Sequence, residues 1–180
     1  MIDFIPLEHY YDYYMYLTSF FVLTILIHSF TLKLDDIKNI KFLRTICYFL
    51  LITSIFYFGL RPISGRYFGD MATYAYHYNN YINGAPIVVD KDYLFHYYMK
   101  ISSQIVSINV FFLITEFLYI YPMYLISKIH FKEYWFYAFF MFAVSFSFYS
   151  YGVNGIRNGV ATSMFLWALC YPKNKKLFLL

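Results

Sequence analysis

Long apolar segments alternate with short polar connectors along most of the chain. Tyr13–Leu32 has 20 residues, about the number that crosses a hydrocarbon core as a helix. Four further apolar segments are interpreted as spans: Thr45–Leu60, Ile105–Ser127, Tyr134–Tyr151 and Asn158–Tyr171. Tyr13–Leu32 has no basic stretch before it and no small-residue cleavage site after it, so we expect it to be a retained span and not a signal peptide. The pattern predicts an all-α protein, a polytopic transmembrane helix bundle of about five spans.

A polar stretch between the second and third predicted spans breaks this pattern. Proline disfavours helix in the residue before it, so Arg61-Pro62 ends the second span. Residues 61–104 are too polar to cross a bilayer and predict a long extracytoplasmic loop. Within it, Asn79-Asn80 and Asn83-Gly84 indicate turns. Asp92–Gln104 has apolar residues at helical spacing, which predicts a short helix lying in the membrane interface.

The composition supports a membrane protein. The chain is 61% hydrophobic and 13% charged, whereas about 25% of the residues of a soluble domain are charged. Cys47 and Cys170 lie inside apolar segments and are interpreted as buried hydrophobic residues. We expect residues 1–180 to form a single integral membrane domain. Leu177–Leu180 resembles the first turn of a further span, so we expect the sequence to be the N-terminal part of a longer protein.

Basic residues are divided unevenly between the two sides of the predicted bundle. One side receives nine of the 14: Lys33, Lys38, Lys41, Arg44, Lys128, Lys132, Lys173, Lys175 and Lys176. The other side receives five: Arg61, Arg66, Lys91, Lys100 and Arg157. The positive-inside rule places the richer side in the cytoplasm, with the N-terminus and the long loop outside. Arginine binds phosphate and carboxylate in a bidentate manner, so the outer arginines are predicted to be functional. The alternative is that they extend to lipid phosphates.

Two glycine-containing segments carry the candidate chemistry. Gly59–Tyr78 (GLRPISGRYFGDMATYAYHY) holds three glycines, two arginines and one aspartate directly after a predicted span. Asn154–Gly159 (NGIRNG) is the second segment, and it leads into the last predicted span. Arg157 would lie in the first turn of that helix, where unpaired amide hydrogens and the helix dipole favour an anion.

Together these segments resemble the EpsG-like branch of the Wzy-type polysaccharide polymerases, from about Phe58 to Leu169. In that family an arginine ends an early span, a Gly-Asp element with a tyrosine follows in an outer loop, and an I-R-x-x-[IV]-A signature opens a later helix. The matching residues here are Arg61, Asp70, Tyr74, Arg157 and Ala161. The chain departs from the family at the interfacial segment, where DYLF replaces the usual Glu-Pro start.

The resemblance implies a metal-independent membrane glycosyltransferase that joins lipid-linked repeat units in exopolysaccharide, capsule or O-antigen biosynthesis. Its location would be the bacterial inner (cytoplasmic) membrane. No cofactor is expected, because the polyprenyl pyrophosphate carrier is part of the substrate. The expected partners are membrane lipid, lipid-linked oligosaccharide and other membrane proteins of polysaccharide assembly. No nucleic acid partner and no metal site are expected.

Glycosyl transfer requires a stabilised leaving pyrophosphate and a base for the acceptor hydroxyl. Arg61, Arg66 and Arg157 are predicted to hold the pyrophosphate, and Asp70 is the first candidate for the base; a turn or helix-capping aspartate is the alternative. The remaining predicted substrate-binding residues are Tyr74, His77, Glu116 and Asn154. By contrast, the polar residues Asp90, Asp92 and His96 are interpreted as solvated.

Glu116 lies about midway along a predicted span, where an ionisable group is costly and suggests function. It is expected either to pair with an arginine or tyrosine inside the bundle or to face a water-filled cavity. Three alternatives to a polymerase stay open. They are a glycan ligase, a lipid-linked sugar transporter or flippase component with Glu116 as the coupling group, and an assembly subunit without catalytic activity.

Overall fold

The structure is a computed structural model that describes residues 5–31, 36–89 and 91–171, and every regular element in these ranges is helical. The helices are α1 (Tyr10–Thr31), α2 (Ile37–Gly59), α3 (Met71–Ile82), α4 (Tyr93–Ser103), α5 (Ile108–Phe131), α6 (Trp135–Ala143), α7 (Phe146–Val153) and α8 (Ile156–Leu169). Short 3-10 turns occupy Leu7–His9 and Lys132–Tyr134. Some predictions lie outside the described residues: those for Leu32, Lys33, Asp90, Lys173, Lys175, Lys176 and Leu177–Leu180.

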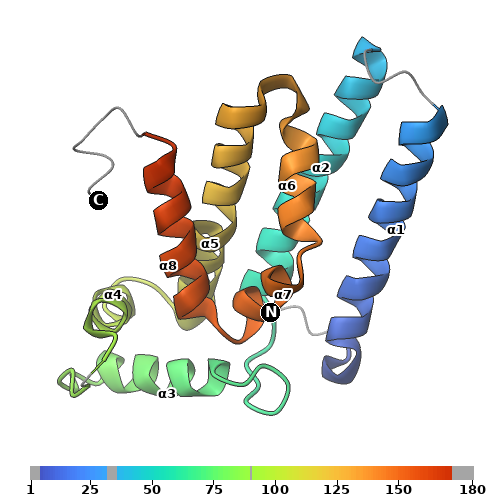
Figure 1. Cartoon of the computed structure of the whole chain (residues 1–180). Helices are drawn as coiled ribbons and strands as arrows, with labels where there is room; N and C mark the ends of the chain where they lie inside the picture. The colour runs from blue at the N-terminus through green and yellow to red at the C-terminus, as the bar shows by residue number, and fades with distance from the viewer. Residues whose placement is uncertain (1–4, 32–35, 90, 172–180) are drawn as a thin grey trace.

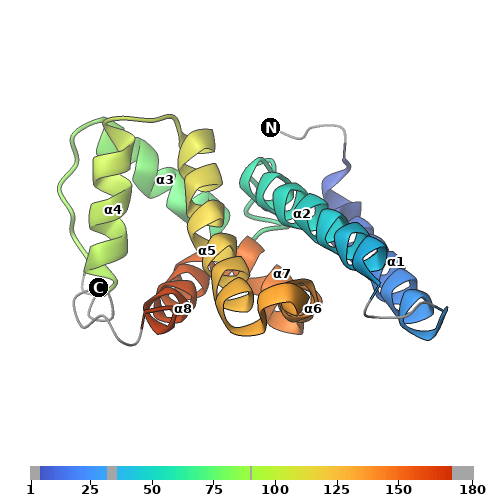
Figure 2. The same ribbon diagram turned by 90° about the horizontal axis from the view of Figure 1, so that it is seen from above.

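The helices form an upright bundle with two helices lying across one end. In Figure 1, α1, α2, α5, α6 and α8 run roughly along the bundle axis, while α3 and α4 lie below α5 and α8. Figure 2 shows α3 and α4 side by side next to the start of α5. Helix α5 is the centre of the bundle, since it packs against α2, α6 and α8. The fold confirms the prediction of an all-α bundle.

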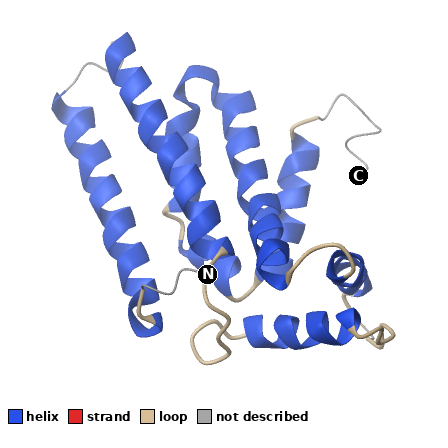
Figure 3. Ribbon diagram, turned by 180° about the vertical axis from the view of Figure 1, so that it is seen from behind, coloured by secondary structure: helices blue, strands red, loops and turns tan. Residues whose placement is uncertain are grey.

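Three segments are long and apolar enough to cross a membrane: Leu7–Phe30, Ile37–Gly59 and Ile108–Ala143. The third contains a hairpin, because the chain turns at Lys132, where φ is 46°, and α6 returns beside α5 (Figure 3). The first three predicted spans therefore correspond to α1, α2 and α5. The remaining two do not form full-length helices.

The prediction of one continuous fourth span over Tyr134–Tyr151 is wrong. Helix α6 ends at Ala143, and α7 begins at Phe146 after an extended Ser145 with ψ of 143°. The Ser145 hydroxyl donates a hydrogen bond to the carbonyl of Phe142, and such local bonds compete with the helical ladder. The predicted fifth span is the 14-residue α8, about 21 Å long, which is shorter than a hydrocarbon core.

Close contacts hold α2 to its neighbours. At Gly59 a Cβ atom would lie 2.8 Å from the Cα of Leu113 on α5, so only glycine permits this approach of the two helices. On the other side, the rings of Tyr10 on α1 and Tyr57 on α2 stack with centroids 4.2 Å apart. The hydroxyl of each donates to the backbone carbonyl of the other. These contacts fix the α3–α4 end of α1 and α2.

The two ends of the bundle carry different connectors. Arg44 near the start of α2 donates to the carbonyl of Glu133 in the α5–α6 turn, at 3.0 and 3.3 Å. These two basic connectors therefore lie at the same end. The 61–104 segment and the α7–α8 turn lie at the opposite end (Figure 1). This division agrees with the predicted placement of successive connectors on alternate sides of the membrane. Which end of the bundle faces the cytoplasm stays a prediction.

The 61–104 segment contains two helices instead of one. The predicted helix over Asp92–Gln104 is confirmed as α4, whereas α3 was not expected. The turn predicted at Asn79-Asn80 is wrong, because both residues lie inside α3. The turn at Asn83-Gly84 is confirmed, and Gly84 has a φ of 84°. Helix α3 forms because its apolar residues at helical spacing are buried beneath the bundle.

Candidate functional site

Helix α3 presents a polar face to α4. Asp70, which precedes the helix, and Tyr74, His77 and Tyr81 are spaced three or four residues apart and so share one face. The Tyr81 hydroxyl lies 2.8 Å from Nδ1 of His96 on α4. The rings of His77 and His96 meet edge to face, with centroids 5.1 Å apart. Two histidines and two tyrosines thus line the contact between α3 and α4.

An ion pair joins this face to α8. The carboxylate of Asp92, directly before α4, accepts a hydrogen bond from the guanidinium of Arg157 in the first turn of α8. Both side chains are 37% exposed. Asp92 has a left-handed backbone with φ of 60°, a conformation that aspartate tolerates better than most residues. The Nε atom of Arg157 is buried and has no hydrogen-bond partner among the described residues.

The charges of Asp92 and Arg157 both affect the pKa values of Tyr74 and His96. Burial raises the pKa of Tyr74; Asp70 and Asp92 raise it further, and Arg157 opposes the increase. Burial lowers the pKa of His96, with His77 and Arg157 acting in the same direction and Asp92 opposing them. Burial therefore favours the neutral phenol of Tyr74 and the neutral imidazole of His96.

The α7–α8 turn lies against the loop that leads into α3. Gly69 has a φ of 45°, and a Cβ atom there would lie 2.8 Å from Oδ1 of Asn154. Asp70 follows Gly69 directly, and Arg157 lies one turn beyond Asn154. The two predicted functional segments therefore meet in the structure. We refer to Asp70, Tyr74, His77, Tyr81, Asp92, His96 and Arg157 as the α3–α4–α8 cluster.

Two of the predicted site residues are internal. Arg61 is 1% exposed, and its guanidinium donates to Oε1 of Glu116 at 3.1 Å and to the carbonyl of Val153 at 3.2 Å. A further bond reaches the carbonyl of Phe58. The side chains of Arg61 and Glu116 are both fully buried. Of the two expectations for Glu116, a partner inside the bundle or a water-filled cavity, the structure shows the first, with Arg61 as the partner. Arg61 instead links α2, α5 and the end of α7, and in this arrangement it does not reach the surface.

Arg66 is exposed and lies outside the cluster. Its guanidinium carbon is 5.5 Å from the ring centroid of Tyr67, and no ion pair joins it to another described residue. Conversely, the sequence reasoning missed Asp92, His96 and Tyr81. The interpretation of His96 as solvated is wrong, because it is 8% exposed. The spacing of four residues between Asp92 and His96 on a predicted helix was the signal that could have identified them.

Metal coordination is not evident among these residues. Within the described ranges, no three His, Cys, Asp or Glu side chains come together in a group that could hold a metal ion. What the cluster offers is a cation at a helix N-terminus with a carboxylate partner, a second carboxylate near Tyr74, and two neighbouring imidazoles. Such a set can bind an anion and transfer a proton.

The fold and the cluster define a helical membrane protein with a group of ionisable residues at the α3–α4 end of the bundle. The sequence model of the EpsG family matches residues 51–180, and the chain belongs to this family. It is therefore a membrane-embedded protein of polysaccharide biosynthesis. No curated protein and no solved structure matches the chain. The match includes the whole α3–α4–α8 cluster and leaves α1 outside.

Proposed function

We propose that the chain is a membrane glycosyltransferase, a polysaccharide polymerase that joins oligosaccharide repeat units carried on polyprenyl pyrophosphate. Its active site would be the α3–α4–α8 cluster. The observation that carries this proposal is the Asp92–Arg157 pair at the N-terminus of α8, next to candidate bases on α3 and α4. Membership of the EpsG family supports the polysaccharide substrate.

Arg157 has the properties required of a group that binds the leaving pyrophosphate. The first amides of α8 have no helical partners, and the helix dipole adds positive potential at the same place. The arginine contributes a full charge and a planar set of donors. Its present partner, Asp92, is partly exposed, and pairs of this kind contribute at most about 1 kcal/mol. A pyrophosphate with two or more charges can therefore replace this contact.

The transfer itself needs a proton acceptor near the attacking hydroxyl. The acceptor oxygen would form a bond to the anomeric carbon, the bond from that carbon to the pyrophosphate oxygen would break, and the lipid pyrophosphate would leave. Asp70, exposed before α3, is the first candidate to receive the proton, and the uncharged His96 is the second. Arg61 would act as a positioning residue, because its bond to the Val153 carbonyl fixes the turn that carries Asn154.

The test is complementation of a polymerase-deleted strain by the intact gene with Arg157→Ala, with glycan length examined on a gel. We expect single repeat units in place of long chains, at an unchanged level of the protein in the membrane. The matched control is Arg44→Ala, which removes the same side chain at the opposite end of the bundle and should leave chain length unchanged. Unchanged chain length in Arg157→Ala would refute the site.

The other functions predict different outcomes in the same strain. A ligase defect would leave long chains on the lipid carrier, not transferred to their final acceptor. A defect in a transporter would leave repeat units on the cytoplasmic side of the membrane. In the transporter alternative, Glu116 would be the coupling group and would need access to ions or protons from solvent. Glu116 is fully buried in its ion pair with Arg61 and has no contact with solvent. For this reason we favour the polymerase.

A further inference from the structure

A cavity of about 440 Å³ lies between the first half of α1 and the break between α6 and α7. Sites for small molecules commonly have volumes of about 300–1,000 Å³, so it can hold a ligand of one or two sugar rings. Along α1 its lining runs from Tyr11 to Thr18, a distance of about 10 Å on a helix. At its far end the lining includes Asn154 in the α7–α8 turn. None of these residues belongs to the α3–α4–α8 cluster.

The lining combines aromatic rings with uncharged polar groups. The rings of Tyr11 and Tyr149 meet edge to face with centroids 4.9 Å apart and form one wall. The polar groups come from Thr18, Ser145 and Ser150, in addition to Asn154. There is no lysine, arginine, aspartate, glutamate or histidine in the lining. This chemistry does not suit a phosphate, which requires cations or helix N-termini.

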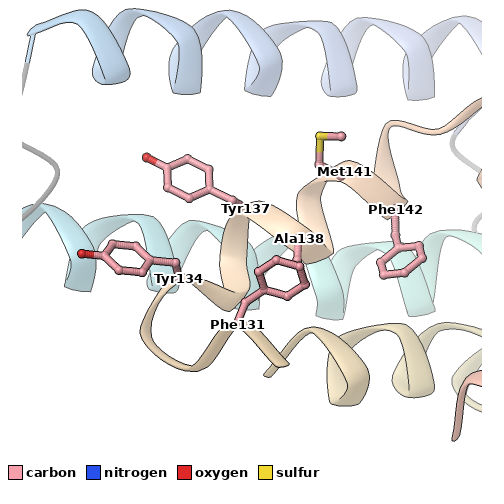
Figure 4. Close-up of a pocket in the computed structure, with 6 residues that line it drawn as sticks. All are labelled: Phe131, Tyr134, Tyr137, Ala138, Met141 and Phe142. Atoms are coloured by element: carbon pink, nitrogen blue, oxygen red, sulfur yellow. The ribbon is translucent and has the colours of Figure 1, made fainter. Parts of the chain in front are cut away.

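A second depression in the protein provides a contrast. It has a volume of about 580 Å³ and is lined from the end of α5 through α6 by Phe131, Tyr134, Tyr137, Ala138, Met141 and Phe142. Figure 4 shows these apolar and aromatic side chains along one side of α6. A lining of this kind suits lipid chains and needs no other ligand. The cavity beside α7 differs because it offers hydrogen-bonding groups at several points.

The interruption of the predicted fourth span contributes Ser145 to the polar part of the lining. Non-helical backbone at membrane depth is tolerated where it is buried in protein or lines a water-filled cavity. Here the chain leaves the helix at Val144 and Ser145, and both residues line the cavity. The side chains of Ser150 and Asn154 make no hydrogen bond to another residue within the described ranges. They are therefore available to a ligand.

We propose that this cavity binds a neutral saccharide, and, if the proposed function holds, that this saccharide is the sugar portion of the lipid-linked substrate. A pyranose ring has a face of C–H groups that can lie on the ring of Tyr11. Its hydroxyls can exchange hydrogen bonds with the neutral side chains of Ser150 and Asn154. Asn154 also lies against Gly69, so this part of the lining adjoins the loop that carries Asp70, the candidate base. A sugar bound here would extend toward the α3–α4–α8 cluster.

The test measures saccharide binding directly and does not require polymerisation. The purified full chain in nanodiscs would be mixed with the methyl glycosides of glucose, galactose, N-acetylglucosamine and rhamnose, and saturation-transfer-difference NMR would be recorded. We expect saturation of ring C–H protons in at least one glycoside. Tyr11→Ala should weaken this binding about tenfold, the effect of losing about 1.4 kcal/mol of contact with the ring. Tyr11→Phe should retain it, since the aromatic face is kept.

The matched control is Tyr16→Ala on the same helix. Tyr16 is 70% exposed and is absent from the cavity lining, so its removal should leave the saturation unchanged. Lack of saturation in every glycoside, or equal saturation in Tyr11→Ala, would overturn the proposal. Tyr11-dependent saturation of glycerophosphocholine without saturation of the glycosides would also overturn it, by identifying a lipid headgroup as the ligand.

The result can be separated from that of the complementation test. Tyr11-dependent binding together with normal chain length in Arg157→Ala would uphold the saccharide site and reject the polymerase site. Short glycans in Arg157→Ala without glycoside binding would do the reverse. The natural saccharide could be lipid-linked or free, and a farnesyl-pyrophosphate-linked glycoside distinguishes these two sources. If the cavity binds this compound more tightly than it binds the methyl glycoside, the lipid-linked form is the ligand. If it binds both equally, free glycan is the ligand, and either result is consistent with the proposal.

Discussion

Replacement of Glu116 by glutamine removes the partner of a buried arginine without changing the side-chain volume. The guanidinium of Arg61 would then be left in the bundle without a counter-charge, although it would keep its bonds to two backbone carbonyls. Breaking a buried ion pair by removing one partner typically costs about 3–5 kcal/mol. Since both side chains are fully buried, solvent does not reduce this cost. For a chain of this size about 1 kcal/mol shifts the melting temperature by roughly 2–4 °C, so we expect a decrease of about 6–20 °C.

The protein contains its own probes for this measurement. Cys47 and Cys170 are free and buried, so a thiol-reactive dye becomes fluorescent when the bundle unfolds. Melting curves of purified wild type and Glu116→Gln in the same detergent give the shift. A melting temperature within about 2 °C of the wild type would refute the reasoning, because it would correspond to about 1 kcal/mol or less.

The double variant Arg61→Met/Glu116→Met separates the charge from the other contacts of Arg61. Replacing a whole buried pair by apolar residues is often neutral, but here the carbonyls of Phe58 and Val153 lose a donor. Each carbonyl left unpaired costs about 1–3 kcal/mol. The two carbonyls together cost about 2–6 kcal/mol, so we expect a melting temperature below that of the wild type and comparable to that of Glu116→Gln. The same double variant can be examined in the complementation test. If it restores long glycans, Arg61 positions the site without contacting substrate. If it folds well but gives no polymer, the result supports the predicted catalytic role of Arg61.

Three further predictions concern other parts of the molecule. Gly59→Ala should destabilise the protein by about 1–3 kcal/mol, because its Cβ would lie 2.8 Å from the Cα of Leu113; the same dye assay measures this. The lowered pKa of His96 means that protonation favours the unfolded state. Its contribution to stability should therefore be present above about pH 6.5 and decrease as the pH falls below it, and His96→Asn should flatten this dependence in melting curves. Arg157→Ala should change the melting temperature by less than about 4 °C, since the pair with Asp92 is partly exposed, while it abolishes long glycans.

The sequence was sufficient for the parts of the fold that follow from long apolar segments. Helices α1, α2 and α5 correspond to the first three predicted spans, because a segment of that length and polarity has few alternatives in a membrane. The helix break at Ser145 could not be predicted, because serine also occurs within continuous spanning helices. Whether its hydroxyl interrupts the helix depends on how the surrounding residues pack. Helix α3 was missed for a similar reason. Its paired asparagines are typical of turns, and only the burial of Tyr78 and Tyr81 in the assembled bundle outweighs that preference.

The candidate site was predicted in part. The sequence indicated that the Gly59–Tyr78 and Asn154–Gly159 segments act together, and the contact between Gly69 and Asn154 brings them together in the structure. The sequence pattern also placed Arg61 among the ligand-binding arginines. An arginine at the end of a span has the same sequence pattern whether its side chain lies inside the bundle or at its surface. Its partner Glu116 is 55 residues away, and only the packing of α2 against α5 shows that the two side chains meet.

The pairing of Arg157 with Asp92 constrains how the cluster can work. These residues are 65 positions apart in the sequence, and they meet because α3 and α4 fold back beneath the start of α8 (Figure 1). A partly exposed pair contributes little stability, so its presence is better explained by its position at a helix N-terminus that attracts anions. In this structure Asp92 supplies the negative charge there. Under the proposed function, a bound pyrophosphate would release Asp92 toward His96, one turn along α4, where a carboxylate raises the basicity of the imidazole. Substrate binding and preparation of a base would then be coupled through one arginine.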